Sequence, residues 1–547
     1  MRTVPAVSLV LLFLLPGFAA AQAPDPAAKV DEIFAEWRSL ESPGCTVAVA
    51  EKGKTLVSRA YGMADLEHDV PITTSTVFEA GSVSKQFTAA AVLLLVQQGK
   101  LALSDDVRKY VPELPDYGKP ITIEHLIHHT SGLRDWGAIA WVHGWPRGTR
   151  VHTHAHVLDI ASRQKELNYE PGAEFGYTNT GYNLLAMIVD RVSGQSFAEF
   201  SKKNIFEPLG MKHTQWGGDF TRVVKGRAVA YVKRDDGFHS AMPFENVYGN
   251  CCLLTTSEDL LLWNENFIHG KVGGPALIEA LLRRGRLNDG REIEYAGGLF
   301  IGTYEGLQEI SHDGATAGYR AFLGRFPEQQ LSVAVLCNLG GETDPSGFAH
   351  RTADLFLTGK KPAAAAPSAP TIELPAEEIS SKAGVYRNLR TSEALRLEVK
   401  EGKLHTGRGR LLLPLSTSRF QLADLDVKLD FITGPTGTTG LRVLYSNGDA
   451  VPFERVAEGV STAGQLAEYA GEYRSDEAEV TYRVLMEDGK LVVKGGPDIS
   501  VALTPLYADG FQAGDEFMVR FTRNGSGKVS GLTLSFDRVR ALRFERR

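Results

Sequence analysis

A serine and a lysine three residues apart, Ser82 and Lys85, form the pair best suited to covalent chemistry. Residues at this spacing share one face of a helix, so the lysine amine can reach the serine hydroxyl. A serine is a weak nucleophile that needs a nearby base, and burial lowers the pKa of a lysine toward that role. We predict that Ser82 is the nucleophile and that Lys85 activates it. The competing interpretation is that Ser82 or Ser84 only caps the helix.

A second group, Tyr177 and Asn179, lies in a turn-rich segment that opens with Pro171-Gly172. Such a segment can project a phenol and an amide toward a substrate. We predict that Tyr177 is catalytic and passes a proton between nucleophile and leaving group, and that Asn179 binds a substrate carbonyl. The competing interpretation is a turn in which the asparagine bonds its own backbone.

A third group, His312, Gly314 and Ala315, precedes a predicted strand. Gly314 has no side chain, so a substrate could approach the edge of that strand closely. The backbone N–H of Ala315 would then join that of Ser82 as a donor to an oxyanion, and one such donor contributes roughly 2.7 to 4 kcal/mol in kcat. We predict that these three residues bind substrate; a surface histidine beside a turn is the competing interpretation.

In chain order, the three groups have the pattern S-x-x-K, Y-x-N and H-x-G, which resembles the penicillin-recognising serine hydrolases. This family includes class C β-lactamases, DD-carboxypeptidases, D-aminopeptidases and related esterases. The resemblance covers about residues 30–355 and includes four scaffold-like stretches, GKLALSDDV, ITIEHLIHHTSGL, PLGM and LTTSEDLLLW. It implies an acyl-enzyme on Ser82, with proton transfers shared by Lys85 and Tyr177. Asn179 and His312 would position the substrate.

Two departures from the family pattern bear on the substrate. His312 stands where many β-lactamases and carboxypeptidases have a lysine, so a fixed positive charge for a substrate carboxylate is missing. Residues 249–252 are Gly-Asn-Cys-Cys instead of a glycine-rich stretch, so the wall of the site differs. We therefore predict an exported serine hydrolase acting on an ester, amide or D-amino-acid peptide. The alternatives are a β-lactamase or DD-carboxypeptidase and, from another class, a non-catalytic binding or sensor protein on the same scaffold.

The elements that must position these groups follow from hydrophobic patterning. Residues 44–60 alternate as in a β-hairpin, and strands return after Gly297 and around 331–336. Between them, an apolar helix is predicted from about Ser82 to Gln98, buried on nearly all sides. The pattern indicates an α/β sandwich, with an antiparallel sheet that is closed late in the chain, flanking helices and a helical subdomain.

The C-terminal part is predicted to be a duplicated β module. Ala-Gly-Val-Tyr-Arg at 383–387 recurs as Ala-Gly-Glu-Tyr-Arg at 470–474, and Phe-Glu-Arg at 453–455 recurs at 544–546. Short alternating strands indicate two small antiparallel barrels, similar to the paired lipocalin-like domains that follow the catalytic domain in D-aminopeptidases. We expect them to cap the site, so that truncation after Gly359 changes the substrate range.

The chain is predicted to begin with a signal peptide (1–21) and a β-lactamase-like serine hydrolase domain (25–358). A Pro/Ala-rich linker (359–371) then leads to a first β-barrel module (372–460) and to a second module that repeats it (463–547). The signal peptide rests on Arg2, the apolar run from Val4 to Leu15 and the Ala-rich end at 19–21. It implies a secreted or periplasmic protein; a membrane anchor is the competing interpretation. A net charge of -7 makes nucleic acid an unsuitable partner. We expect a small-molecule or peptide substrate and no transmembrane span after signal removal, and the oligomeric state stays open.

No cofactor and no metal are expected. Cys45 and Cys337 lie in apolar strand-like runs and are predicted to be buried free thiols, whereas adjacent Cys251 and Cys252 receive no chemical role. His125, His128 and His129 are assigned to the scaffold rather than to a metal site. The alternating residues His152, His154 and His156 are assigned to one solvated face of a strand, with adventitious binding of a transition metal as the alternative. Trp136, Trp141 and Trp145 lie in an irregular segment, where they either pack a long loop or line a substrate pocket.

Overall fold

The computed structural model describes residues 26–359, 371–434, 437–459, 462–496, 499–514, 517–536 and 538–547. The predicted signal peptide and the Pro/Ala-rich stretch at 360–370 lie outside these residues. In the part of the chain that is described, no helix combines the length and the apolar character needed to cross a membrane.

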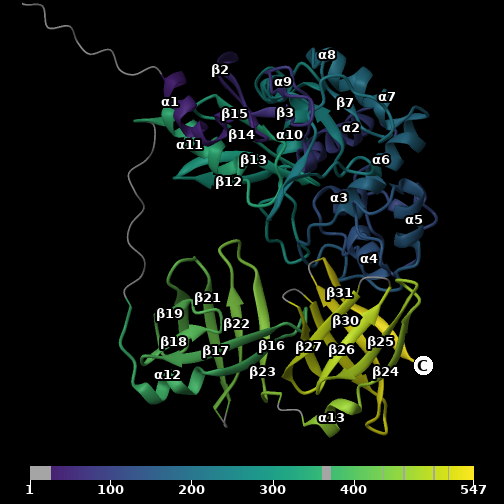
Figure 1. Cartoon of the computed structure of the whole chain (residues 1–547), viewed down its shortest axis with the longest axis vertical. Helices are drawn as coiled ribbons and strands as arrows, with labels where there is room; N and C mark the ends of the chain where they lie inside the picture. The colour runs from purple at the N-terminus through teal and green to yellow at the C-terminus, as the bar shows by residue number, and fades with distance from the viewer. Residues whose placement is uncertain are drawn as a thin grey trace, which may run out of the picture.

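A six-stranded antiparallel sheet forms the centre of the N-terminal region (Figure 1). Its strands are, in spatial order, β12 (Phe300–Tyr304), β13 (Leu307–Thr316), β14 (Tyr319–Phe326), β15 (Leu331–Cys337), β1 (Cys45–Glu51) and β2 (Lys54–Tyr61). The N-terminal hairpin β1–β2 therefore pairs with β15, the last strand of the region. This confirms the prediction that strands late in the chain complete the sheet begun by the N-terminal hairpin.

Helices cover both faces of this sheet. On one face, α1 (Pro26–Ile33) and α11 (Pro345–Leu357) enclose a core that includes Phe34, Val335 and Phe348. On the other face lie α9 (Ser257–His269) and the buried helix α2 (Lys85–Gln97). The remaining helical elements of the region are η1 (Ala35–Arg38), η2 (Gly81–Ser84), η3 (Val107–Lys109), α3 (Ile123–Ile127), α4 (Trp136–His143), α5 (His154–Ser162), α6 (Asn179–Ser193), α7 (Phe197–Ser201), η4 (Lys202–Phe206), α8 (Glu207–Leu209) and α10 (Gly274–Leu282).

Nine short strands lie outside the six-stranded sheet in the described part of this region. They are β3 (Met63–Asp65), β4 (Val70–Pro71), β5 (Phe78–Glu79), β6 (His152–Thr153), β7 (Gln215–Trp216), β8 (Tyr231–Arg234), β9 (Gly237–Ser240), β10 (Glu245–Asn246) and β11 (Leu253–Thr255). Of these, β11 pairs with both β5 and β7. β5 comes directly before the nucleophile segment, so this small sheet helps to hold it.

The predicted helix at Ser82 begins differently from the expectation. Its first turn is the 3₁₀ element η2, and the α-helix starts only at Lys85. The Ser84 hydroxyl accepts a hydrogen bond from the backbone N–H of Leu253, at 3.1 Å, and does not cap the helix. No side-chain cap is present at η2 either, so the capping interpretation of this serine pair is wrong.

Cys45 and Cys337 form a disulfide, so the prediction of free thiols is wrong. They lie directly opposite each other where β1 pairs with β15. The residues are 292 positions apart in the chain. Their pairing depends on a strand register that neither apolar run reveals alone.

The secondary structure predicted for two short segments is also wrong. The histidines at 152, 154 and 156 do not share a strand face, because β6 ends at Thr153 and α5 begins at His154. Thr153 forms a capping box with His156, so a helix start stands where the alternation suggested a strand. Residues 136–143 are the helix α4 and not an irregular segment, and Asp135 is its N-cap.

Two closed antiparallel barrels follow, which confirms the predicted fold class (Figure 1). Each is preceded by a short helix, α12 (Ala376–Lys382) or α13 (Ala463–Ala467). The first barrel contains β16 (Gly384–Asn388), β17 (Ala394–Lys400), β18 (Lys403–Thr406), β19 (Leu411–Pro414), β20 (Arg419–Leu422), β21 (Lys428–Gly434), β22 (Gly437–Leu444) and β23 (Ala450–Val456). The second contains β24 (Gly471–Ser475), β25 (Val480–Glu487), β26 (Lys490–Gly495), β27 (Ile499–Tyr507), β28 (Gly510–Ala513), β29 (Phe517–Arg523), β30 (Val529–Phe536) and β31 (Val539–Arg546).

The repeated sequence motifs make the same contacts in both barrels. The hydroxyl of Tyr386 donates to the carbonyl of Lys382 at 2.8 Å, and that of Tyr473 donates to the carbonyl of Tyr469 at 2.7 Å. The arginines that end the two Phe-Glu-Arg motifs donate to the carbonyls of Ala383 and Ala470, respectively. The repeated tyrosine and arginine therefore make equivalent hydrogen bonds in the two barrels.

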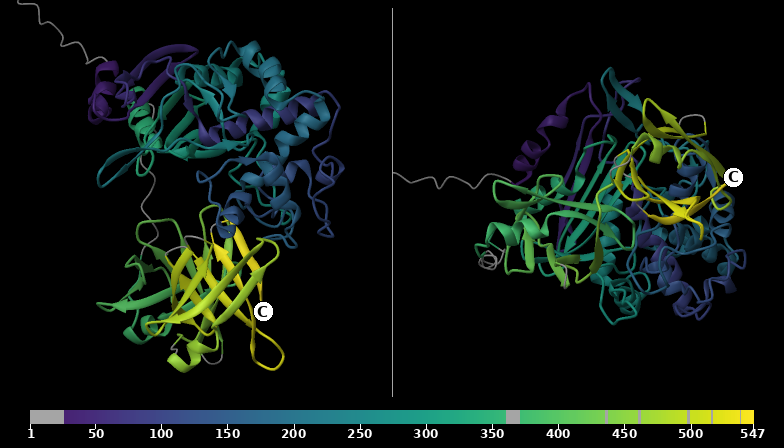
Figure 2. Two further views of the ribbon diagram at one scale, coloured as in Figure 1. Left: turned by 45° about the vertical axis from the view of Figure 1, so that its right-hand side comes forward. Right: turned by 90° about the horizontal axis from the view of Figure 1, so that it is seen from below.

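The second barrel docks beneath α4 and α5 (Figures 1 and 2). Arg134 and Glu477 form a salt bridge there, with Nη1 and Oε2 2.6 Å apart and side chains 1% and 4% exposed. Trp141 of α4 stacks on Phe517 of β29, with ring centroids 4.5 Å apart. An aromatic contact and a buried ion pair thus hold the second barrel against α4 and the residues just before it.

Candidate active site

Ser82 and Lys85 come together as the sequence predicted. Ser82 lies in η2 at the N-terminal end of the buried helix α2, and it is partly exposed. Lys85 is fully buried, and its Nζ lies 3.1 Å from Ser82 Oγ. An accessible hydroxyl and a buried amine are therefore in hydrogen-bond contact.

Two other oxygens bind the Lys85 amine: Asn179 Oδ1 at 3.1 Å and the carbonyl of Asn250 at 2.8 Å. Both atoms only accept hydrogen bonds, so they occupy two N–H groups of the amine. A neutral amine then keeps its lone pair for the Ser82 proton. Burial lowers the pKa of Lys85 to about 7, so the neutral form is well populated near neutral pH. The amine can therefore act as a base toward the serine.

Tyr177 faces the same amine. Lys85 Nζ lies 4.7 Å from the centroid of the tyrosine ring. The Tyr177 hydroxyl is buried and makes no direct hydrogen bond within the described part of the chain. Burial raises the pKa of Tyr177 above its usual value, and the nearby Ser82 hydroxyl opposes that rise. At neutral pH the phenol is therefore protonated and is a proton donor rather than a base.

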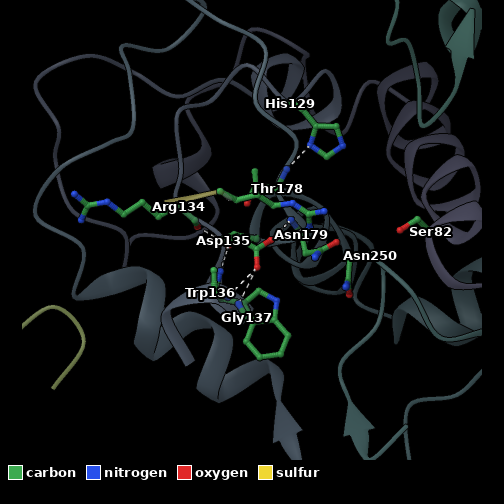
Figure 3. Close-up of polar contacts among 12 residues, drawn as sticks. Ser82, His129, Arg134, Asp135, Trp136, Gly137, Thr178, Asn179 and Asn250 are labelled. Carbon is green, nitrogen blue, oxygen red and sulfur yellow. Dashed lines mark hydrogen bonds and ion pairs between the residues drawn. The ribbon is translucent and has the colours of Figure 1, made fainter. Parts of the chain in front are cut away.

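Asn179 is held at the start of α6 by Asp135 (Figure 3). The backbone N–H of Asn179 donates to Asp135 Oδ2 at 2.7 Å, and that of Thr178 donates to His129 Nδ1 at 3.2 Å. Asp135 also accepts from the backbone N–H of Gly137 at the start of α4. One carboxylate thus joins the N-termini of two helices and fixes the amide that contacts Lys85.

Gly314 lies directly against the segment that carries the serine. A Cβ at this position would stand 2.1 Å from the carbonyl oxygen of Ala80, so no other residue fits without a shift. β12 pairs with β13 only as far as Ser311, and the exposed Ala315 follows on the uncovered edge. The predicted oxyanion donors, the N–H groups of Ser82 and Ala315, come from these adjacent segments. Gly314 allows strand β13 to pack on the nucleophile segment, whereas the prediction assigned it to substrate approach.

His312 is turned inward. Its Nδ1 lies 2.6 Å from the carbonyl of Asp313, and its Nε2 lies 3.1 Å from the hydroxyl of Tyr295. Burial lowers the pKa of His312 to about 4, so the ring is neutral at neutral pH. A neutral ring that donates to the carbonyl and accepts from the tyrosine is fully bonded within the protein. A substrate that bonded to Nε2 would have to displace the Tyr295 hydroxyl.

A positive charge reaches the site from the second barrel. Arg538 lies in the turn between β30 and β31, and its guanidinium carbon is 4.9 Å from the centroid of the Tyr177 ring. Its Nη1 is 3.7 Å from Asp135 Oδ2, and the side chain is 35% exposed. The backbone carbonyl of Arg538 also accepts from Asn168 Nδ2 at 2.8 Å. The C-terminal barrel therefore contributes a charged side chain beside Tyr177.

Four participants were missed by the sequence reasoning: Asp135, Asn250, Tyr295 and Arg538. Asp135 could have been found, because an aspartate before an apolar run is a typical helix N-cap. Asn250 acts through its backbone carbonyl, which carries no side-chain signal. Tyr295 and Arg538 reach the site only through tertiary packing.

Comparisons with known proteins show the family of the chain. Residues 30–357 match the protein family described as Beta-lactamase. A D-aminopeptidase from Gluconobacter oxydans is 28% identical over 529 residues, covering 92% of this chain and 96% of that protein. Penicillin-binding protein 4* from Bacillus subtilis is 28% identical over 429 residues, covering 74% of this chain and 93% of that protein. The structure of an octameric penicillin-binding protein homologue from Pyrococcus abyssi has a TM-score of 0.54 at 24% identity, covering 86% of this chain and 98% of that one, and so shares the fold.

Proposed function

The chain belongs to the beta-lactamase family of serine hydrolases, and on that premise we propose that Ser82 forms an acyl-enzyme with a D-amino-acid amide, ester or peptide. One observation carries the proposal: Lys85 Nζ lies 3.1 Å from Ser82 Oγ while its other hydrogen bonds go to two acceptor-only oxygens. This environment suits a neutral amine that takes the serine proton.

In the proposed acylation, Ser82 Oγ forms a bond to the substrate carbonyl carbon as its proton passes to Lys85 Nζ. The N–H groups of Ser82 and Ala315 bind the resulting oxyanion. The bond to the leaving amine or alcohol then breaks, and that group takes a proton either from Lys85 directly or from Tyr177, which Lys85 then reprotonates, so that the amine is again neutral and the phenol again protonated. Water attacks the acyl-enzyme by the reverse sequence, with Lys85 taking its proton, which releases the acid and restores Ser82.

The substrate class is proposed from the relative that spans both barrels. The D-aminopeptidase covers 92% of this chain, so the similarity includes the C-terminal modules as well as the site. Neutral His312 provides no positive charge for a substrate carboxylate, which fits a substrate without one. A D-aminoacyl group, as in a D-amino-acid amide, carries no carboxylate and so meets both observations.

Arg538 supports a second candidate. Its guanidinium lies beside Tyr177 and places near the nucleophile the positive charge that His312 lacks. A guanidinium binds carboxylates well, so a carboxylate-bearing donor such as a penicillin or an acyl-D-alanyl-D-alanine is the alternative. The protein would then be a β-lactamase or DD-carboxypeptidase.

The deciding experiment is a kinetic panel combined with intact mass. The purified protein would be assayed on D-alanine and L-alanine p-nitroanilides and incubated separately with benzylpenicillin and a fluorophosphonate probe. We expect one probe adduct per chain and preferential turnover of the D-anilide. A stable penicillin adduct without anilide turnover would favour the second candidate. The absence of both adducts and of turnover in folded protein would leave a non-catalytic binding protein on this scaffold.

The pH dependence of kcat/KM should follow Lys85. Because burial lowers its pKa to about 7, the active neutral form is lost as pH falls below that value. We expect kcat/KM to drop about tenfold per pH unit below 7 and to level off above it. Glu79 is another buried group with a pKa of about 7, so Glu79→Gln serves as the control and should keep the acidic limb. A limb that disappears in this variant would reassign it to Glu79.

Removing the charge of Arg538 separates the two substrate candidates. If this guanidinium binds a carboxylate, Arg538→Gln should slow acylation by benzylpenicillin by about tenfold or more. Turnover of the D-anilide, which carries no carboxylate, should change little. Arg543→Gln is a matched control on β31, because Arg543 pairs with Glu166, whereas Arg538 contacts Asp135 and the Tyr177 ring. Equal effects of Arg538→Gln on both substrates would rule out carboxylate recognition by this residue.

We also propose that the protein is exported to the periplasm or the exterior. The N-terminal sequence supports this, and so does the Cys45–Cys337 disulfide, since disulfides persist mainly in oxidising compartments. Intact mass of protein expressed with its full leader should show a new N-terminus at Gln22. Retention of residues 1–21 in the protein recovered from the cell would argue for an anchor instead.

A further inference from the structure

Two cysteine thiols and one carboxylate lie close together near Lys85: Cys251, Cys252 and Glu79. Cys251 Sγ and Cys252 Sγ lie 3.0 Å apart, and both thiols are free and buried. Glu79, on β5, brings a carboxylate oxygen to them, and one ligand atom from each of the three residues lies within 4.8 Å of the others. Glu79 and the two cysteines are more than 170 positions apart in the chain, so the cluster arises from the fold.

Two further observations point to a ligand at this cluster. Glu79 is 3% exposed, and its Oε1 has no hydrogen-bond partner in the described part of the chain. A buried, unsatisfied carboxylate oxygen is costly unless something binds it. Cys252 has a φ of 73°, in the left-handed region that residues other than glycine rarely adopt. Such strained conformations persist where the surrounding structure enforces them, often at binding sites.

We propose that Glu79, Cys251 and Cys252 form a binding site for one thiophilic divalent cation, such as Zn²⁺ or Cd²⁺. Thiolates are the ligands that such ions prefer, and a carboxylate oxygen is a common third ligand. In a tetrahedral site with bonds of about 2.3 Å, the two sulfurs stand about 3.8 Å apart. A rotation of the cysteine side chains would open the present contact to that spacing.

The charges around the cluster accommodate such an ion. Arg227 pairs with Glu79 at 3.2 Å, and Arg147 pairs with Glu245 through both carboxylate oxygens. With both thiols protonated, this group of charges sums to zero. A divalent cation that displaces one proton from each thiol into solvent leaves the sum at zero. Arg147 Nη2 already lies 3.5 Å from Cys251 Sγ, so a guanidinium stands against one of the two sulfurs.

A cation bound at this site would change the hydrogen bonding of Lys85. Cys251 follows Asn250, whose carbonyl accepts a hydrogen bond from Lys85 at 2.8 Å. Movement of Cys251 onto a metal ion therefore shifts one of the acceptors that hold the amine. We expect the bound cation to slow the reaction of Ser82 with a fluorophosphonate. The binding itself does not depend on the proposed hydrolase function.

The test is metal binding to the whole protein. Chelator-treated protein would be titrated with Cd²⁺, desalted and analysed for cadmium per chain and for ultraviolet thiolate-to-cadmium absorption. We expect one tightly held Cd²⁺ per chain with that absorption, loading slowly because both thiols are buried. The double variant Cys251→Ser/Cys252→Ser should lose both signals, and Glu79→Gln should bind at least about tenfold more weakly. Fluorophosphonate labelling of Ser82 and circular dichroism would show whether each variant is folded.

The exposed cluster of Asp65, Glu67 and His68 provides the matched control, because it is another group of suitable ligands in the described residues. His68→Ala should leave the cadmium content and the absorption unchanged. Cadmium content that persists in the double cysteine variant would overturn the proposal, even if labelling of Ser82 is normal. So would the finding that Cys251 and Cys252 are already joined as a disulfide in the purified protein, two hydrogens lighter by mass. Loss of binding in Glu79→Gln with normal labelling would support the site independently of the cysteine variants.

Discussion

Replacing the proposed nucleophile, in Ser82→Ala, is expected to lower kcat for a turned-over D-amino-acid substrate by about 10⁴- to 10⁶-fold. The alanine cannot form the acyl-enzyme, so both steps of the proposed reaction are lost. The backbone N–H of residue 82 remains, so binding of substrate and of the carbonyl oxygen should survive. We therefore expect KM to change much less than kcat, measured by steady-state kinetics on the D-anilide.

Ser84→Ala is the matched control for this prediction. Ser84 is two residues away and buried, and its hydroxyl accepts from the N–H of Leu253 rather than contacting Lys85. Its loss should cost stability of about 1–3 kcal/mol through an unsatisfied backbone donor, while most of the activity remains. Turnover by Ser82→Ala within about a hundredfold of wild type would mean that another group is the nucleophile.

Neutralising Glu477, in Glu477→Gln, is expected to destabilise the docking of the second barrel by about 3–5 kcal/mol. The substitution leaves the guanidinium of Arg134, 1% exposed, without its charged partner. Glu477 also accepts from the backbone N–H of Lys165 at 2.7 Å, which the amide retains only in one orientation. Hydrogen–deuterium exchange should rise in the peptides that cover 134–145 and 476–482, which meet at this interface. Because Arg538 reaches Tyr177 from the same barrel, benzylpenicillin acylation should slow as well.

Glu166→Gln is the control for the ion pair. Glu166 contacts Arg543 across the same two parts of the chain at 2.6 Å, but both side chains are largely exposed. Exposed pairs contribute about 0–1 kcal/mol, so little change in exchange is expected. If the two variants behave alike, the barrel is held by its aromatic and backbone contacts and the Arg134–Glu477 pair is dispensable.

Local patterns of the sequence predicted the parts of the site that are local in the chain. Ser82 and Lys85 meet because residues three apart lie on one side of a helical turn, whether that turn is 3₁₀ or α. The barrels could be predicted because duplication preserved a tyrosine, a glycine and an arginine that close each one in the same way. Errors arose where a short alternating pattern fits two structures, as at His152 to His156, where a helix cap replaced the expected strand.

The tertiary structure decided what depends on segments far apart in the chain. The disulfide of Cys45 and Cys337 requires the pairing of the first strand with the last. The inward orientation of His312 depends on Tyr295, and the charge beside Tyr177 comes from Arg538. Burial of Lys85, which lowers its pKa, is a property of the packed core around it. The sequence by itself determined that Ser82 and Lys85 lie together, because helix geometry fixes the distance between residues three apart. Their protonation and electrostatic surroundings depend on packing, which brings residues that are distant in the chain within a few ångströms.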